Sequence, residues 1–211
     1  KENRRRVFEE LGLRPEQVVF THQFHSTILK KVAASDGGRG FAAFNDGIEG
    51  DALYTSEKNL ALAVYHADCV PIFFYVPTRG LIGIIHAGMA GTLKSITKLV
   101  INEFCQKENV HPQDIYCYLG PCLTFSHKEI SLEMRDDIAS LGKEFLQGIK
   151  AVGPTLYFDT MLVNVIQLRQ CGIPIENIDY AGECVYEHQE KYFSFARDQI
   201  TGRMISLIYQ K

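Results

Sequence analysis

The chain has 211 residues, of which 46% are hydrophobic and 22% are charged. This composition can fill one sizeable hydrophobic core, so we expect a single domain over residues 1–211. The formal net charge of −3 gives no general attraction to nucleic acid or to an anionic membrane surface, so we expect neither as a partner.

The first third of the chain predicts one helix, a strand and a long loop. Residues 2–12 have the apolar spacing of a helix, and residues 18–32 are rich in the β-branched and aromatic residues that are typical of a strand. His22 and His25 are three positions apart, so a straight strand would point them to opposite faces, and at most one would face a site. The glycine-rich residues 35–50 are interpreted as a surface loop or the lid of a site.

The middle of the chain predicts three consecutive strands followed by a helix. Strands are expected at 60–66, 69–77 and 81–88, with a tight turn between the last two. Pro71 favours an edge or a bulge for the second of them, whereas the third is apolar on both faces and is expected at the centre of a sheet. Residues 92–108 carry a clear apolar stripe and predict a helix.

The last third alternates strands and helices. Ser126 and Glu129 match a capping box, which predicts a helix that continues to about residue 146. Asp159 is expected to cap a helix at 160–171. Further strands are expected at 114–123, 178–186 and 202–211. The whole pattern indicates an α+β or mixed α/β fold, with mixed β-sheets flanked by helices.

No targeting segment is evident in the sequence. The longest apolar run, residues 60–76, contains His66 and Asp68, so we do not expect it to span a bilayer. The basic N-terminus lacks the apolar stretch that follows in a secretory signal peptide. The six cysteines form no CxxC pair and are expected to be reduced and mostly buried. These features favour a cytoplasmic protein.

Cys69 and His86 stand out as the residues most suited to chemistry. A strand, a tight turn and a second strand separate them, so they can return to the same edge of a sheet. With one further histidine they would form a catalytic zinc site with an open position. The same pair could instead be a Cys–His nucleophile or part of a His₂Cys copper site for electron transfer. The plainest alternative is a buried cysteine beside a hydrogen-bonded histidine.

A glycine-rich turn, HAGMAG, follows the strand that carries His86. Gly88 and Gly91 would let an anion approach free backbone N–H groups at a helix start, so this turn is either a phosphate or oxyanion site or an ordinary strand-to-helix turn. Arg197 and Arg203 could supply anion contacts near the last strand, or be ordinary surface charges. The remaining histidines with polar or helix-flanking neighbours are expected at the surface or as caps: His66, His111, His127 and His188.

Several short motifs, in order along the whole chain, resemble those of the YfiH-like family. These motifs are QFHS, GDALYT, ADCVPI, HAGMAG, GPC, FDT with NVIQL, and FSFARD with TGRM. The family was first described as polyphenol oxidoreductases or laccase-like domains, and its better-supported activity is that of zinc-containing purine nucleoside phosphorylases. The resemblance implies a metal site with His25, Cys69 and His86 as ligands. Zinc is the expected metal, with copper as the alternative.

The resemblance also implies the reaction. We expect phosphorolysis of adenosine, inosine and 5′-methylthioadenosine, with adenosine deamination as a companion activity. The substrates would then be a purine nucleoside and phosphate, and the enzyme would be a transferase with an additional hydrolase activity. A metal that activates water or polarises the purine could serve both reactions, and the glycine-rich turn could hold phosphate.

Three features depart from the family pattern. Met89 and Ala90 replace the Trp and Arg of its HAGWRG motif, and Ala196 replaces the first arginine of a pair of which Arg197 remains. The family's N-terminal strand, with its arginine-containing, glycine-rich segment, is absent before Lys1. All three differences remove cationic or aromatic groups near the place where an anionic co-substrate would bind.

Two other functions remain open, and a third is not expected. Cys69 and His86 would also serve a thiol hydrolase or deamidase, and the loss of basic and aromatic residues would suit a non-enzymatic member that acts as an interaction protein. A multicopper laccase is not expected, because its trinuclear cluster needs many histidines in HxH pairs. This chain has seven histidines and no such pair.

Overall fold

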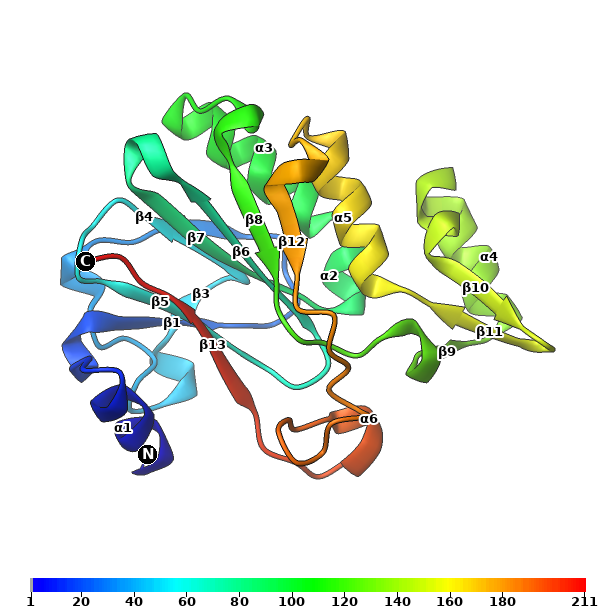
Figure 1. Ribbon diagram of the computed structural model, residues 1–211, viewed down its shortest axis with the longest axis horizontal. Helices are drawn as coiled ribbons and strands as arrows, with labels where there is room; N and C mark the ends of the chain where they lie inside the picture. Colours follow the sequence, from blue (N-terminus) through cyan, green and yellow to red (C-terminus); the bar gives the residue numbers. More distant parts are fainter. Residues whose placement is uncertain (1) are drawn as a thin grey trace.

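Two mixed β-sheets stack face to face at the centre of the fold in the computed structural model, which describes residues 2–211 (Figure 1). The strands of the larger sheet are β2 (Leu29–Lys31), β4 (Ala52–Thr55), β6 (Val70–Val76), β7 (Leu81–Ala87), β8 (Tyr116–Leu119) and β12 (Ile178–Tyr180). Their order is β12-β8-β6-β7-β4-β2. The smaller sheet contains β1 (Val18–His22), β3 (Ile48–Glu49), β5 (Ala61–His66) and β13 (Met204–Ile208). Its order is β13-β5-β1-β3.

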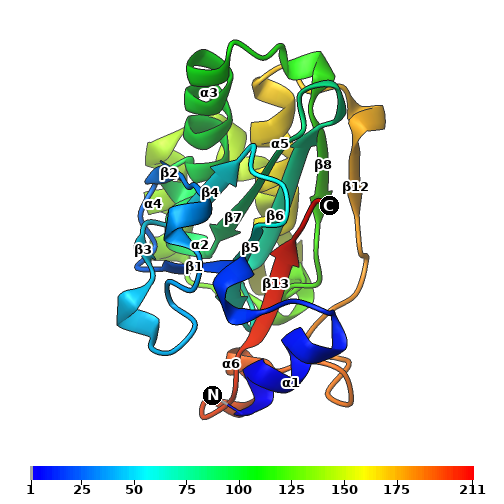
Figure 2. The ribbon, with the colours of Figure 1, turned by 90° about the vertical axis from the view of Figure 1, so that its left-hand side faces the viewer.

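Helices cover the outer faces of both sheets, which gives four layers (Figures 1 and 2). Helices α3 (Ile96–Glu108) and α5 (Thr160–Gln170) pack on the larger sheet, and α1 (Glu2–Glu10) packs on the smaller one. The strands alternate accordingly: in β5, Leu62 joins the core between the sheets, whereas Ala63 faces α1. This architecture confirms the predicted mixed α/β class, with mixed sheets flanked by helices.

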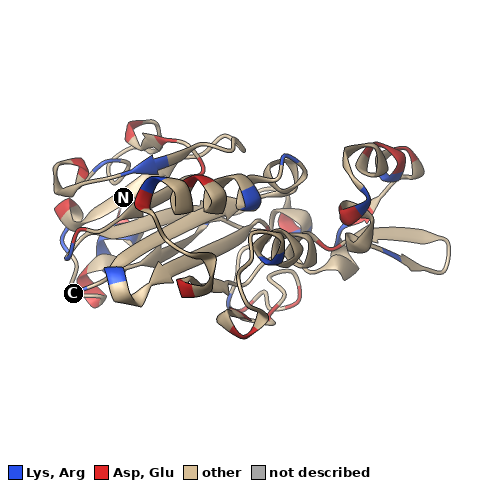
Figure 3. Ribbon diagram, turned by 90° about the horizontal axis from the view of Figure 1, so that it is seen from above, with Lys and Arg blue, Asp and Glu red and all other residues tan. Residues whose placement is uncertain are grey.

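A small three-stranded sheet projects from one side of these layers (Figure 3). It contains β9 (Glu129–Ile130), β10 (Ile149–Val152) and β11 (Thr155–Phe158), in the order β10-β11-β9, beside α4 (Leu132–Leu141). Ile138 and Phe158 lie in its separate hydrophobic cluster. Acidic and basic residues are interspersed over the molecule (Figure 3), and no helix within residues 2–211 has both the length and the apolar character to cross a bilayer.

The predicted strand 18–32 is two short strands in different sheets. The chain leaves β1 at His22 and enters β2 at Leu29, and the connection between them contains His25 at φ 59°. This left-handed backbone conformation is uncommon for a residue other than glycine and ends the regular strand. The argument that His22 and His25 point to opposite faces of one strand was therefore wrong, because His25 lies in a loop.

The predicted helix 92–108 begins earlier and is broken. A short helix, α2 (Met89–Leu93), precedes α3, and Ser95 between them adopts φ 59°. Gly91 therefore lies inside α2 rather than in the turn before it. The first N–H groups of the helical segment follow Gly88 directly, not Gly91.

The predicted capping box was also wrong. Glu129 belongs to β9, and the true cap of α4 is Ser131, whose hydroxyl accepts a hydrogen bond from the Met134 N–H at 3.0 Å. Asp159 does cap α5, as predicted, by accepting from the Leu162 N–H at 2.9 Å. Residues 149–158 form the unpredicted β10–β11 hairpin.

Pro71 lies in a central strand rather than at an edge. Strand β6 pairs with β7 on one side and with β8 on the other. Pro71 is the second residue of β6, opposite His86, and its carbonyl accepts from the Gly120 N–H at 2.9 Å. A proline is tolerated here because it stands at the start of the strand. The predicted strand at 81–88 is central, as expected, since every residue of β7 is buried.

Candidate metal centre

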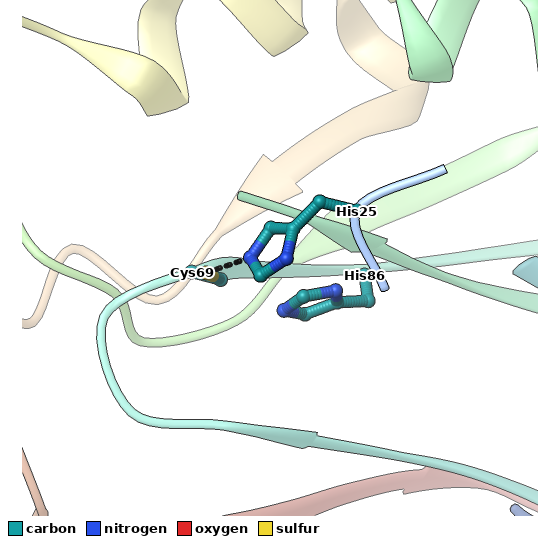
Figure 4. Close-up of side chains that lie close together, drawn as sticks. All are labelled: His25, Cys69 and His86. Atoms are coloured by element: carbon teal, nitrogen blue, oxygen red, sulfur yellow. Dashed lines mark hydrogen bonds between the residues drawn. The ribbon is translucent and has the colours of Figure 1, made fainter. Parts of the chain in front are cut away.

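His25, Cys69 and His86 lie side by side at one end of the larger sheet (Figure 4). One ligand atom of each lies within 4.8 Å of those of the other two. Cys69 Sγ is 3.9 Å from His25 Nε2, and the two imidazole rings are 5.0 Å apart. The three residues that the resemblance implied as ligands are thus brought together by the fold.

The pairing of β6 with β7 places Cys69 beside His86. Cys69 directly precedes β6, and the antiparallel register sets Pro71 opposite His86. The two strands and the turn between them therefore bring Cys69 and His86 to the same edge of the sheet, as predicted. His25 comes from the β1–β2 loop, whereas His22 lies against Phe44, with 5.0 Å between ring centres.

Asp51 holds this arrangement together and was not identified from the sequence. Its side chain is fully buried, with 0% exposed. Its carboxylate accepts hydrogen bonds from the backbone N–H groups of Phe24 at 3.3 Å, His25 at 3.1 Å and Ser26 at 2.6 Å, and from the Ser26 hydroxyl at 2.7 Å. The β1–β2 loop therefore wraps around one carboxylate, which offsets the cost of the left-handed backbone at His25.

Asp51 also orients His86. Its Oδ1 atom lies 2.8 Å from His86 Nδ1, so this ring nitrogen donates to the carboxylate and Nε2 is left free to bind a metal. In zinc sites, the second ring nitrogen of a metal-binding histidine commonly donates a hydrogen bond to a carboxylate. The only signal in the sequence was the place of Asp51 in the GDALYT motif, because an aspartate before a strand is equally suited to a turn.

Gly88 provides the space that the three side chains need. A Cβ atom added at Gly88 would lie 2.7 Å from His25 Cδ2 and 2.8 Å from Cys69 Sγ. Its φ of −78° is ordinary, so the requirement is for space and not for backbone freedom. This cradle and the N, S, N donor set fit a zinc ion.

The charges of the site favour a thiolate at Cys69. Burial opposes ionisation, but hydrogen bonds from His25 and His86 outweigh it and lower the pKa of Cys69 to about 6. Burial likewise opposes the charge on His86, and its hydrogen bonds with Asp51 and Cys69 raise its pKa to about 9. The pKa of Asp51 is lowered, because hydrogen bonds from His86 and Ser26 outweigh its desolvation. The thiolate is the form of cysteine that binds metals.

A cavity of about 720 Å³ opens beside the three residues. Its aromatic lining comes from four separate parts of the chain and consists of Phe24, Phe44, Tyr65 and Phe195. Its cationic side chains are Lys94, Lys128 and Arg203. Met89 and Ala90, the two residues that depart from the family's HAGWRG motif, also face the cavity. The cavity therefore combines aromatic surface and positive charge next to the candidate metal ligands.

Of the residues predicted to bind an anion, some line the cavity and others do not. Gly91 is buried in α2 and does not line the cavity. The Arg197 guanidinium points away from it and donates to the carbonyls of Val185, Tyr186 and Tyr192. Arg203 does line the cavity. The cationic residues Lys94 and Lys128 were not singled out from the sequence, although Lys94 follows the HAGMAG turn by three residues.

His66 corrects the expectation of a surface or capping residue. It is buried in the wall of the cavity, and its Nε2 atom lies 2.8 Å from the Ser206 hydroxyl. Burial, and then the charge on His86, lower its pKa to about 3. His66 is therefore neutral at physiological pH. His111 is exposed, as predicted.

The family described as multi-copper polyphenol oxidoreductase laccase matches residues 1–211, the whole of the chain. The chain belongs to this family. Curated relatives of this YfiH-like member include the purine nucleoside phosphorylase YlmD of Bacillus subtilis, 33% identical over 92% of the chain and 70% of the relative. YlmD of Geobacillus stearothermophilus is 34% identical over 98% of the chain and 77% of the relative.

Solved structures of family members have the same fold. A crystal structure of YlmD from Geobacillus stearothermophilus matches with a TM-score of 0.93 and 33% identity, over 99% of this chain and 79% of that one. The YfiH protein of Bacillus licheniformis matches with a TM-score of 0.92 and 30% identity, over 100% of this chain and 80% of that one. The resemblance inferred from the motifs is thereby confirmed.

Gly88→Ala is expected to prevent metal binding while the protein still folds. The added methyl group would occupy the space between His25 and Cys69. We therefore expect zinc affinity to fall by at least about 100-fold, which exceeds the usual effect of replacing a residue that only hydrogen-bonds a metal ligand. Gly91→Ala is the matched control, since its Cβ would meet only Ile96 at 3.4 Å and more distant atoms. A competitive zinc titration of both variants tests this, and equal affinities would contradict it.

Proposed function

We propose that this protein is a zinc-dependent purine nucleoside phosphorylase that acts on adenosine, inosine and 5′-methylthioadenosine, with adenosine deamination as a second reaction of the same site. The main support for this proposal is the cluster of His25, Cys69 and His86 beside a cavity with aromatic and cationic walls. Asp51 holds His86 in this cluster through a hydrogen bond. The names of its curated relatives, purine nucleoside phosphorylases at 33–34% identity, support the same reaction.

The three clustered residues would hold the metal, and Asp51 would keep His86 in the required tautomer and orientation. Zinc bound there supplies a Lewis acid that polarises a substrate atom or lowers the pKa of a water molecule. A mononuclear site with one cysteine and two histidines leaves room for such an atom. These three side chains are too few to hold the trinuclear copper cluster of a laccase.

The cavity walls suit the two substrates. Exposed aromatic rings at Phe24 and Phe195 offer faces on which a purine can stack. Lys94, Lys128 and Arg203 supply the positive charge that attracts phosphate. In phosphorolysis a phosphate oxygen bonds to C1′ of the ribose and the bond from C1′ to the purine nitrogen breaks, which gives ribose 1-phosphate and the free base.

The reaction is tested by incubating the purified protein with each nucleoside and phosphate. Chromatography that separates ribose 1-phosphate, free base and inosine distinguishes phosphorolysis from deamination. We expect base and sugar 1-phosphate in equal amounts from each nucleoside. The sugar product is ribose 1-phosphate from adenosine and inosine, and 5-methylthioribose 1-phosphate from 5′-methylthioadenosine. We also expect inosine from adenosine when phosphate is omitted. Absence of every product would overturn the proposal and favour a non-enzymatic interaction protein.

A thiol hydrolase or deamidase is the second candidate, because the same geometry lowers the pKa of Cys69 to about 6 beside His25 and His86. Metal content separates the two functions. A zinc enzyme should resist alkylation at Cys69 until a chelator is added, since a bound thiolate is shielded. Rapid alkylation of metal-free, freshly purified protein would instead support the hydrolase.

Ala90→Arg is expected to improve the use of phosphate. Ala90 is exposed in the cavity wall, so an arginine there would place a further guanidinium beside Lys94. A partly solvated charge pair contributes about 0.2–1 kcal/mol, which corresponds to a KM for phosphate that is lower by a factor of about 1.4 to 5. Ala90→Gln is the neutral control for side-chain length. Steady-state kinetics at varied phosphate test this, and an equal change in both variants would contradict it.

A further inference from the structure

A second group of metal-binding side chains lies outside the site described above. One ligand atom from each of His127, Cys184 and Glu187 lies within 4.8 Å of those of the other two. His127 ends the 3₁₀ turn Phe125–His127, and the other two residues belong to the segment that follows β12. Residues far apart along the chain thus present nitrogen, sulfur and oxygen donors to one point.

Two of the ligands are held in place by other contacts. Cys184 is buried, with 3% exposed, and forms an isolated β-bridge with Cys122. The His127 ring stacks on Tyr186, with centres 4.0 Å apart and planes 12° apart. The sulfur and the imidazole are therefore oriented before any ion binds.

The carboxylate of Glu187 completes the group. Its Oε1 atom accepts a hydrogen bond from the His127 Nε2–H at 3.0 Å. A zinc ion would replace this proton and that of the Cys184 thiol, and both protons would pass to solvent. Sulfur, imidazole and carboxylate together suit zinc, whereas calcium and magnesium prefer oxygen ligands alone.

The segment 181–203 is tied to Asp68 by hydrogen bonds from Ser194 and Ala196, and a metal would tie its first part as well. This segment joins β12 to β13 and contains only one short helix, α6 (Phe195–Asp198), yet it supplies Phe195 and Arg203 to the cavity wall. Long stretches with little regular structure depend on specific contacts to stay ordered. A metal that links Cys184 and Glu187 to His127 would fasten this segment to the turn beside Lys128, another residue of the cavity wall.

We propose that His127, Cys184 and Glu187 bind a second zinc ion, which fastens the segment 181–203 to the turn 125–127. Water would take the fourth position. None of the three residues lines the cavity of the first site, so we assign this ion to fastening the segment and not to the proposed reaction.

Metal analysis of the native protein and two variants tests this. After dialysis against zinc, we expect two zinc ions per chain in the native protein and one in Glu187→Gln. Glu187 is exposed, so this variant should fold normally. Glu190→Gln removes an equally charged, exposed residue of the same segment and should keep two ions. Limited proteolysis should cut the segment 181–203 at least about tenfold faster in Glu187→Gln than in Glu190→Gln.

Cys69→Ser assigns the two ions to their sites, because it should lose one ion without faster proteolysis of 181–203. One zinc ion in the native protein would overturn the proposal, provided that Cys69→Ser then has none. Two ions in Glu187→Gln with native affinity would overturn it as well.

Discussion

Replacing Cys69 with serine is expected to remove zinc from the first site and to lower phosphorolysis by at least about 1,000-fold. Serine keeps the shape of the side chain, but its hydroxyl stays protonated and is a poor ligand beside His25 and His86. Loss of the Lewis acid removes several kcal/mol of transition-state stabilisation, and about 4 kcal/mol corresponds to that factor.

Cys105→Ser is the matched control for this experiment. Cys105 is a free, partly buried thiol in α3, and it takes no part in the cluster. The control should keep its metal and its activity. Ribose 1-phosphate formation and zinc content are measured on the same preparations, and native turnover in Cys69→Ser would refute the assignment of Cys69 as a ligand.

Replacing Asp51 is expected to weaken both the metal site and the fold. Asp51→Ala would leave His86 Nδ1 and the N–H groups of the β1–β2 loop without their buried acceptor. Removing one partner of a buried ion pair costs about 3–5 kcal/mol of unfolding free energy. Asp51→Asn keeps the volume but loses the charge behind His86, so we expect zinc affinity to fall about 10–100-fold.

Urea unfolding and a competitive zinc titration measure these two effects. Asp46→Asn is the control, because Asp46 is an exposed acidic residue of the same part of the chain. Its stability and zinc affinity should match those of the native protein. Native zinc affinity in Asp51→Asn would show that Asp51 does not position His86.

Cys69 and His86 could be predicted from the residues alone, because they lie close together in the sequence. Cys69 and His86 belong to two strands joined by a tight turn, so antiparallel pairing brings them together wherever the rest of the chain lies. His25 comes from the loop that joins β1 to β2, and its position depends on the wrapping of this loop around Asp51. Spacing could not show that arrangement, and only the family resemblance indicated it.

Side chains with several suitable roles were the main source of wrong or missing predictions. Ser126 and Glu129 match a capping box, but β9 competes for Glu129 and Ser131 caps the helix instead. Arg197 could have faced an anion, yet the carbonyls of the segment 181–203 occupy it. His66 was expected at the surface or as a cap, but β5 lies inside the smaller sheet and buries it.

The mixed α/β class was easier to predict than the layers. Apolar runs and their periodicity depend on each segment alone, whereas the stacking of two sheets depends on which faces of β5 and β7 meet. The β10–β11 hairpin was missed because its residues carry no strong alternation and pack only on a small local cluster.

The most direct test of the account is phosphorolysis of adenosine before and after metal removal. The native protein should release ribose 1-phosphate and adenine, lose this activity on chelation, and regain it when one equivalent of zinc returns to the site formed by His25, Cys69 and His86. Turnover that persists in the fully metal-free protein would contradict the account.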